Sequence, residues 1–187
     1  MNVIIFGPPG AGKGTQALKI VKKFDLYQIS TGDLLRDEVK NQTDIGKNIE
    51  NIISKGDFAT DEIVNELIGN VISDPQKKNK LIFDGYPRSL SQAENLDFLL
   101  NKTNQKIDFI FFLNVKKDTI IKRIEKRRII EKRSDDSLST ILKRYDTYMD
   151  TTKPVLDFYS KKPNFYEIDG SHKIEEISIK IEQILSV

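Results

Sequence analysis

The segment GPPGAGKGT, at residues 7–15, contains residue types that bind phosphate groups. It follows the pattern G-x-x-x-x-G-K-[ST], except that Gly14 stands where the pattern has Ser or Thr and the hydroxyl comes one residue later, at Thr15. Glycines allow the backbone N–H groups to point inward at anionic oxygens, and the ammonium of Lys13 adds a positive charge. The segment therefore predicts a phosphate-binding loop, and it raises the question of what holds the metal when position 14 has no hydroxyl.

Arginines in several later segments could bind further phosphate oxygens. A guanidinium group can bind two phosphate oxygens at once and stays charged. This suits a reaction between two polyanions, because such a reaction depends on positioning and electrostatics. Arg123 and Arg127 are spaced to share one helical face. The chain has a single histidine, His172, so it offers few candidate residues for a general-base or acyl-transfer mechanism. The other candidate arginines are Arg36, Arg88, Arg133 and Arg144.

Short apolar runs alternate with helical patterns along the chain, which predicts an α/β fold with a parallel sheet and helices on both faces. In the first helix the spacing predicts that Ala17, Leu18, Val21 and Phe24 share the buried face. Ligands of such a sheet bind at the carboxyl edge of the strands. We expect strands over 2–6, 27–30, 80–85, 107–114 and 164–169, and helices over 14–24, 60–72 (with Thr60 as N-cap), 118–127, 134–149 and 174–185.

Composition narrows the class of protein. A length of 187 residues is typical of one domain. The hydrophobic residues, 38% of the chain, are enough to form a core, and the charged residues, 31%, are enough to form a well-solvated surface. The net charge of +2 gives no general attraction to nucleic acid or to acidic membranes. Without cysteine the chain has no disulfide and no thiolate metal site. The phosphate motif leaves no room before it for a signal peptide, and no apolar run approaches membrane length, so we expect a cytoplasmic protein.

Three motifs resemble those of one enzyme family. GPPGAGKGT is similar to the loop of nucleoside monophosphate kinases, while STGDLLR (30–36) and FDGYPRSLSQAE (83–94) resemble the monophosphate-binding motifs of adenylate kinases. The resemblance covers residues 3 to about 172. It implies a P-loop kinase core with a central five-stranded parallel sheet, formed by residues 1–30, 61–127 and 134–187. It also implies a small helical monophosphate-binding segment (31–60), a short lid (about 128–133) and a cis bond between Tyr86 and Pro87.

The resemblance also implies a role for each matching residue. The transferred phosphoryl group would be surrounded by Lys13, Arg88, Arg127, Arg133 and Arg144. ATP would be bound by Gly10, Ala11, Gly12, Lys13, Gly14, Thr15, Arg123, Arg127 and the region of His172. AMP would be bound by Thr31, Arg36, Gly85, Arg88, Gln92, Arg133 and Arg144.

The resemblance implies that Mg²⁺ is bound with the nucleotide and needs no hydroxyl at position 14. Asp84, and with it Asp33 and Asp136, would hold waters on the metal. For Asp33 and Asp136 a helix N-cap is the alternative role. The zinc-bearing lid of some relatives is excluded because there is no cysteine. We expect a monomer that acts on ATP and AMP.

The acceptor base is predicted from two positions. Adenylate kinases resemble this chain at Thr31 and Gln92, whereas UMP/CMP kinases have Ala at the first position and Asn where Ser89 stands. A glutamine amide can both donate to and accept from the adenine edge. The predicted reaction is therefore the reversible transfer of the γ-phosphoryl group from Mg-ATP to AMP, giving two ADP.

Other functions stay open as alternatives. A UMP/CMP kinase and a GTP:AMP phosphotransferase would use the same scaffold. A GTPase-like switch would need the guanine-reading motif N-K-x-D, and the nearest stretch, NKTN (101–104), ends in asparagine. The balanced charge disfavours a nucleic-acid-binding module.

Overall fold

The computed structural model describes residues 1–54, 59–131 and 138–186. Within them, a five-stranded parallel sheet has the order β2-β3-β1-β4-β5, which confirms the predicted fold class. The strands are β1 (Val3–Phe6), β2 (Tyr27–Ser30), β3 (Leu81–Asp84), β4 (Phe109–Asn114) and β5 (Phe165–Asp169). The helices are α1 (Lys13–Phe24), α2 (Thr31–Lys40), α3 (Asp44–Ser54), α4 (Asp61–Ile72), α5 (Leu90–Lys102), α6 (Lys117–Glu131), α7 (Leu138–Thr147), α8 (Lys153–Tyr159) and α9 (Ile174–Leu185).

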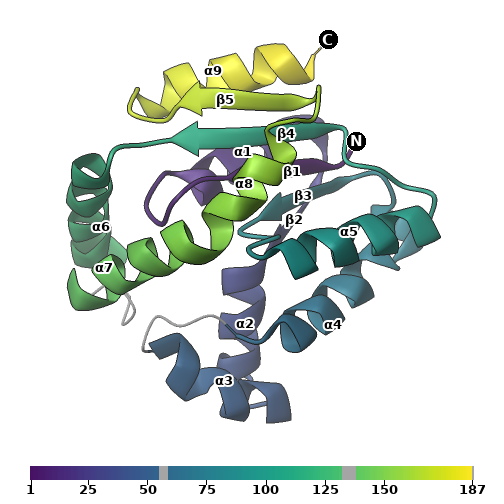
Figure 1. The fold of residues 1–187 in the computed structure, drawn as a ribbon, viewed down its shortest axis with the longest axis horizontal. Helices are drawn as coiled ribbons and strands as arrows, with labels where there is room; N and C mark the ends of the chain where they lie inside the picture. Colours follow the sequence, from purple (N-terminus) through teal and green to yellow (C-terminus); the bar gives the residue numbers. More distant parts are fainter. Residues whose placement is uncertain (55–58, 132–137, 187) are drawn as a thin grey trace.

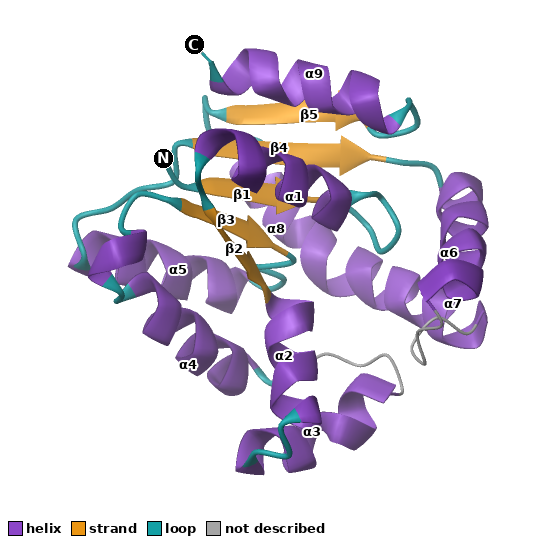
Figure 2. Cartoon of the chain, turned by 180° about the vertical axis from the view of Figure 1, so that it is seen from behind, coloured by secondary structure: helices purple, strands orange, loops and turns teal. Residues whose placement is uncertain are grey.

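Both faces of the sheet are covered by helices (Figures 1 and 2). In β1 all four residues are buried, and they alternate between two cores because successive side chains of a strand point to opposite faces. Ile4 and Phe6 pack in the core beneath α4, α5 and α8, while Val3 and Ile5 pack beneath α1 and α9. Central strands buried on both faces explain why β1 and β3 read as continuous apolar runs.

The order of the strands determines where a ligand can bind. The connection from β1 leads through α1 to β2 at one edge, whereas the connection from β3 leads through α5 to β4 on the other side of β1. The strand order therefore switches direction between β1 and β3, and crevices of this kind bind ligands at the carboxyl ends of the strands. The loops that follow Phe6 and Asp84 meet there.

Two groups of helices flank this carboxyl edge, which faces left in Figure 1. Helices α2 and α3 extend beyond the β2 edge of the sheet and occupy most of the segment predicted to bind the monophosphate, while α6 and α7 lie beside the carboxyl edge itself (Figure 1). Helix α6 continues to Glu131, beyond the predicted end at residue 127, so part of the predicted lid is helical backbone.

Other details of the helices also differ from the prediction. Leu18 is 63% exposed, whereas Ala17 is buried and Val21 and Phe24 are partly buried as predicted, and Gln16 and Ile20 complete the buried face. Helix α7 ends at Thr147 and is followed by a π-helical turn over Tyr148–Thr152, rather than continuing as one helix to 149. Thr60 precedes α4 as expected, but its side chain makes no capping hydrogen bond. None of the helices in the described ranges is long and apolar enough to cross a membrane.

Candidate active site

The loop between β1 and α1 lines a cavity. Gly10 and Gly12 have φ angles of 80° and 98°, which favour glycine. A Cβ at Gly10 would also lie 2.6 Å from Cγ1 of Ile124, so α6 packs directly against the loop. Helix α1 begins at Lys13 with no side chain capping its first turn, which leaves its N-terminal N–H groups and its dipole available to an anion.

Lys13 lies over this loop. Its Nζ donates hydrogen bonds to the carbonyl oxygens of Gly7, at 2.8 Å, and of Pro8, at 3.1 Å. The ammonium group is thus held at the mouth of the loop, where the negative oxygens of a phosphate would lie.

The structure gives a steric reason for glycine at position 14. A Cβ there would lie 3.3 Å from Oδ2 of Asp84, a contact tight enough to require one of the two to shift. Asp84 ends β3, is 9% exposed, and accepts a hydrogen bond of 3.2 Å from Nε2 of Gln28. Burial raises the pKa of this carboxyl group, while the charges of Lys13 and Arg88 oppose the rise. The absence of a side chain at position 14 therefore leaves room for this buried carboxylate beside the loop.

The turn after β3 holds Arg88 in place. The Tyr86–Pro87 bond is cis, and Gly85 has a φ of 78°. Arg88 donates from Nε to the carbonyl oxygen of Gly85, at 2.7 Å, and from Nη2 to Oγ1 of Thr31, at 3.3 Å. Thr31 in turn donates to the same carbonyl oxygen.

Positive charges converge at Arg88. Its burial, together with the charges of Arg144 and Arg36, lowers its pKa to about 10, and Asp84 opposes the shift. The group still carries its charge at neutral pH. Such a concentration of like charges is costly in the protein alone, and it indicates a site for a polyanion.

A variant at Gly85 tests this geometry. A Cβ there would lie 2.9 Å from Nη2 of Arg88 and 3.2 Å from Oγ1 of Thr31, at a φ that L-residues rarely adopt. Gly85→Ala should lower the affinity for the expected monophosphate by tenfold or more, and should destabilise the protein by about 1–2 kcal/mol. In the control Gly69→Ala, within α4, the new Cβ makes ordinary contacts at 3.9 Å with Leu99, and stability should rise by up to about 1 kcal/mol. Binding isotherms and thermal unfolding of both variants measure the two effects. Equal affinities of Gly85→Ala and Gly69→Ala for the monophosphate would contradict the proposed geometry.

Most of the predicted residues line a cavity of about 780 Å³ at the carboxyl edge. Arg36 lies on α2, where it pairs with Asp33, and Arg123 on α6 donates to the carbonyl oxygen of Ala11 at 3.2 Å. Asp33 is not an N-cap, because Ser30 caps α2. The predicted residues in this cavity are Gly10, Ala11, Gly12, Lys13, Gly14, Thr15, Asp33, Arg36, Asp84, Gly85, Arg88, Arg123 and Arg144.

A smaller cavity, of about 40 Å³, adjoins the arginines and contains Thr31 and Gln92. Gln92 is 4% exposed, and both ends of its amide are bonded. Its Oε1 accepts from the backbone N–H of Arg88, at 2.7 Å, and its Nε2 donates to Oδ1 of Asp61, also at 2.7 Å. Apolar side chains of Leu35, Ala59 and Val64 complete the walls.

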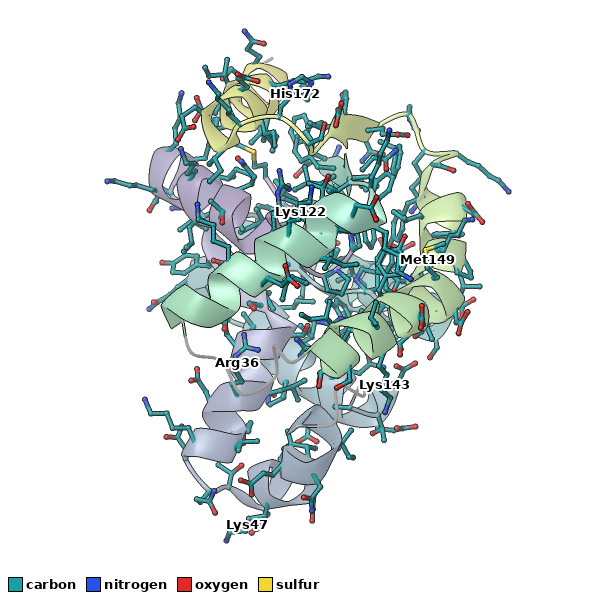
Figure 3. All side chains as sticks on the ribbon, turned by 90° about the vertical axis from the view of Figure 1, so that its left-hand side faces the viewer. Arg36, Lys47, Lys122, Lys143, Met149 and His172 are labelled. Atoms are coloured by element: carbon teal, nitrogen blue, oxygen red, sulfur yellow. The ribbon has the colours of Figure 1, made fainter. Side chains whose placement is uncertain are left out.

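The remaining predicted residues are placed differently or are not described. His172 is exposed beside Asp169 and Glu176 and does not line the large cavity. Figure 3, which views the carboxyl edge, shows it next to α9 and far from Arg36. Arg127 belongs to α6, but its side chain is not described, and Arg133 and Asp136 lie outside the described residues.

Sequence reasoning missed two polar residues that hold the site together, Gln28 and Asp61. Gln28 could have been suspected, because it alternates with Ile29 in a strand that ends at the carboxyl edge. Asp61 reads as an ordinary acidic residue at a helix N-terminus, and only the fold shows its contact with Gln92.

The described residues contain no group of three or more His, Asp or Glu side chains that could hold a metal ion by themselves. Asp84, buried beside the phosphate loop, is a hard oxygen donor of the kind that Mg²⁺ prefers. Since Mg²⁺ keeps several waters and is usually bound with substrate phosphates, one carboxylate behind those waters fits the ion.

Comparisons with known proteins identify the family of this chain. The family model described as adenylate kinase matches residues 5–164. A relative from Pelagibacter ubique, named adenylate kinase, is 50% identical over an alignment of 213 positions that covers all of both chains. An adenylate kinase of Parabacteroides distasonis is 39% identical over 100% of this chain and 98% of the relative. One of Archaeoglobus fulgidus is 36% identical over 99% of this chain and 98% of the relative. The chain therefore belongs to the adenylate kinase family and is a nucleoside monophosphate kinase.

Proposed function

We propose that the enzyme transfers the γ-phosphoryl group of Mg-ATP to AMP and so forms two molecules of ADP. The observation that supports this most is the shape of the site. One cavity joins the phosphate loop to Arg36, Arg88 and Arg144, and the small pocket with Gln92 adjoins the same arginines. Two nucleotides bound end to end would place their phosphates against this positive cluster and the acceptor base beside Gln92.

The reaction needs little proton chemistry. An oxygen of the AMP phosphate forms the new bond to the γ-phosphorus, while the bond from that phosphorus to the β-phosphate oxygen breaks. Catalysis then consists of alignment and of stabilising the charge on the transferred group. Lys13 and the N-terminus of α1 would hold the donor phosphates, Arg36 and Arg88 the acceptor phosphate, and Arg144 the group in transit. Arg127 and Arg133 share that last role by family resemblance.

Mg²⁺ bound with ATP would neutralise charge on its phosphates. Asp84, and Asp33 with it, would orient waters of that ion; the same role for Asp136 follows from the resemblance alone. The hydrogen bond from Gln28 holds Asp84 next to the loop, and the charges of Lys13 and Arg88 favour its ionised form.

The ends of the site are assigned from family resemblance together with the cavity lining. Arg123 would lie against the donor base, and the backbone around His172 would read it, with ATP preferred over GTP. The segments 31–60 and about 128–133 would close over the substrates and exclude water from the triphosphate. We expect the enzyme to act as a monomer.

The acceptor base can be tested at Gln92. Gln92→Leu should reduce kcat/KM for AMP by about 10²-fold and reduce that for UMP much less, because only the adenine contact is lost. The change also removes the donor to Oδ1 of Asp61 and the acceptor of the backbone N–H of Arg88, so the unfolding temperature should fall.

A matched control separates these two effects. Gln105 is a similarly buried glutamine at the opposite edge of the sheet, bonded to Asn2 and Asn79. Gln105→Leu should lower the unfolding temperature without changing the ratio of AMP to UMP use. An equal loss on both acceptors in Gln92→Leu would defeat the base assignment.

The reaction itself is tested by measuring nucleoside diphosphate formation with AMP, UMP, CMP and GMP against ATP and GTP. We expect the highest rate with AMP as acceptor and ATP as donor, with two ADP formed per turnover. Preference for UMP or CMP would make the protein a pyrimidine nucleotide kinase, and preference for GTP would make it a GTP:AMP phosphotransferase. The guanine-motif candidate at 101–104 precedes β4, at the amino edge and away from the phosphate loop, so a switch function has no support from the fold.

A further inference from the structure

The amide of Gln92 is held in one orientation by two groups of opposite character. The backbone N–H of Arg88 can only donate, so the atom facing it, at 2.7 Å, must be the oxygen Oε1. The carboxylate of Asp61 can only accept, so the atom facing it, also at 2.7 Å, must be the nitrogen Nε2. An amide oxygen accepts two hydrogen bonds and an amide nitrogen donates two, so each end keeps one position for a ligand.

Asp61 is itself fixed in place. It begins α4, and its second carboxylate oxygen accepts a hydrogen bond of 2.7 Å from Oγ of Ser89. Ser89 caps α5 and accepts from the backbone N–H of Gln92. The N-termini of α4 and α5 thus meet around one carboxylate, and the protein itself fixes both the position of the Gln92 amide and which of its ends faces which way.

We propose that Asp61 is a specificity-determining positioning residue, which makes the site select 6-amino over 6-oxo purine monophosphates. The inference rests on the proposed use of AMP. An adenine edge offers a donor at N6 and an acceptor at N1, which pair with Oε1 and Nε2 of Gln92. A hypoxanthine edge offers an acceptor at O6 and a donor at N1, and it would pair only with the flipped amide.

Flipping the amide is costly in the native protein. A flipped amide would place Nε2 next to the N–H of Arg88, so that two donors face each other. It would also place Oε1 next to the carboxylate of Asp61, so that two acceptors face each other in a buried site. An asparagine at position 61 can turn its own amide nitrogen toward a flipped Gln92. The conflict at Arg88 would remain, so Asp61→Asn should relax the selection in part and not abolish it.

The experiment compares kcat/KM for AMP and for IMP, with ATP as donor, in the native enzyme and in Asp61→Asn. We expect the AMP-to-IMP ratio to fall by about tenfold, with most of the change in KM for the two acceptors. The control is Glu62→Gln, which removes the same charge from the same turn of α4 at an exposed residue. It should leave the ratio unchanged.

A purely structural role for Asp61 would lower the use of both acceptors together, and an unchanged ratio would overturn the proposal. If Asp61→Asn does not fold, as thermal unfolding would show, Ser89→Ala removes the hydroxyl that holds Asp61 and should lower the ratio by a smaller factor; no change there would overturn the proposal as well. Failure of the proposed function would give a different result, because the native enzyme would then not prefer AMP over the other nucleoside monophosphates.

Discussion

Lys13→Met should lose at least about 10³-fold in kcat while the protein still folds. The side chain carries a charge to the mouth of the phosphate loop, where methionine has the length but no charge to stabilise the transferred group. Its hydrogen bonds in this structure go to the carbonyl oxygens of Gly7 and Pro8, which can bind water instead, so the cost in stability should stay near 1 kcal/mol. Steady-state ADP formation and thermal unfolding measure the two effects.

The matched control is Lys19→Met, in the same helix. Lys19 lies 4.0 Å from Glu175 in a partly exposed ion pair, and such pairs contribute little. Its rate should stay within about twofold of the native enzyme. If Lys13→Met also kept a rate within a few-fold of native, the phosphate-loop assignment would be wrong.

Arg144→Ala should lower kcat by about 10³-fold, the effect expected when an arginine that stabilises the transition state is removed. Arg144 lines both cavities, and its charge contributes to the lowered pKa of Arg88, so it lies near the place where the two phosphates would meet. Arg144→Lys should recover only part of the rate, since an ammonium group cannot bind two oxygens in a planar fork. Single-turnover kinetics would separate the chemical step from product release.

Lys143→Ala is the control for this position. Lys143 is the exposed neighbour of Arg144 on α7 and does not line the large cavity. It should leave kcat nearly unchanged. An unaltered kcat in Arg144→Ala would place its guanidinium on the solvated surface and remove it from the mechanism.

The sheet and the phosphate loop were predictable because their signals are local. Apolar runs such as those of β1 and β3 indicate buried strands by themselves, and Gly10 and Gly12 adopt a backbone conformation that few other residues adopt. The resemblance of residues 83–94 to a monophosphate-binding motif made Asp84 and Arg88 candidates, in agreement with the rule that ligands bind at the carboxyl edge.

Features that depend on packing between distant segments were not predictable. Leu18 has the spacing of a core residue, but which face of α1 is buried depends on how that helix lies on the sheet, and this exposes Leu18 beside the cavity. The partnership of Asp61 with Gln92 joins residues 31 positions apart, and no pattern within either segment indicates it. The end of α7 in a π-helical turn is likewise not indicated by the periodicity of its sequence.

The central claim is that one positive site holds both nucleotides with their phosphates end to end. The most direct measurement is a crystal structure with a bisubstrate mimic, in which two adenosines are joined by five phosphates. The account predicts one molecule per chain, with Lys13, Arg88 and Arg144 contacting the phosphate bridge and one adenine beside Gln92. Guanidinium groups directed away from that bridge, or two mimics bound at separate places, would contradict it.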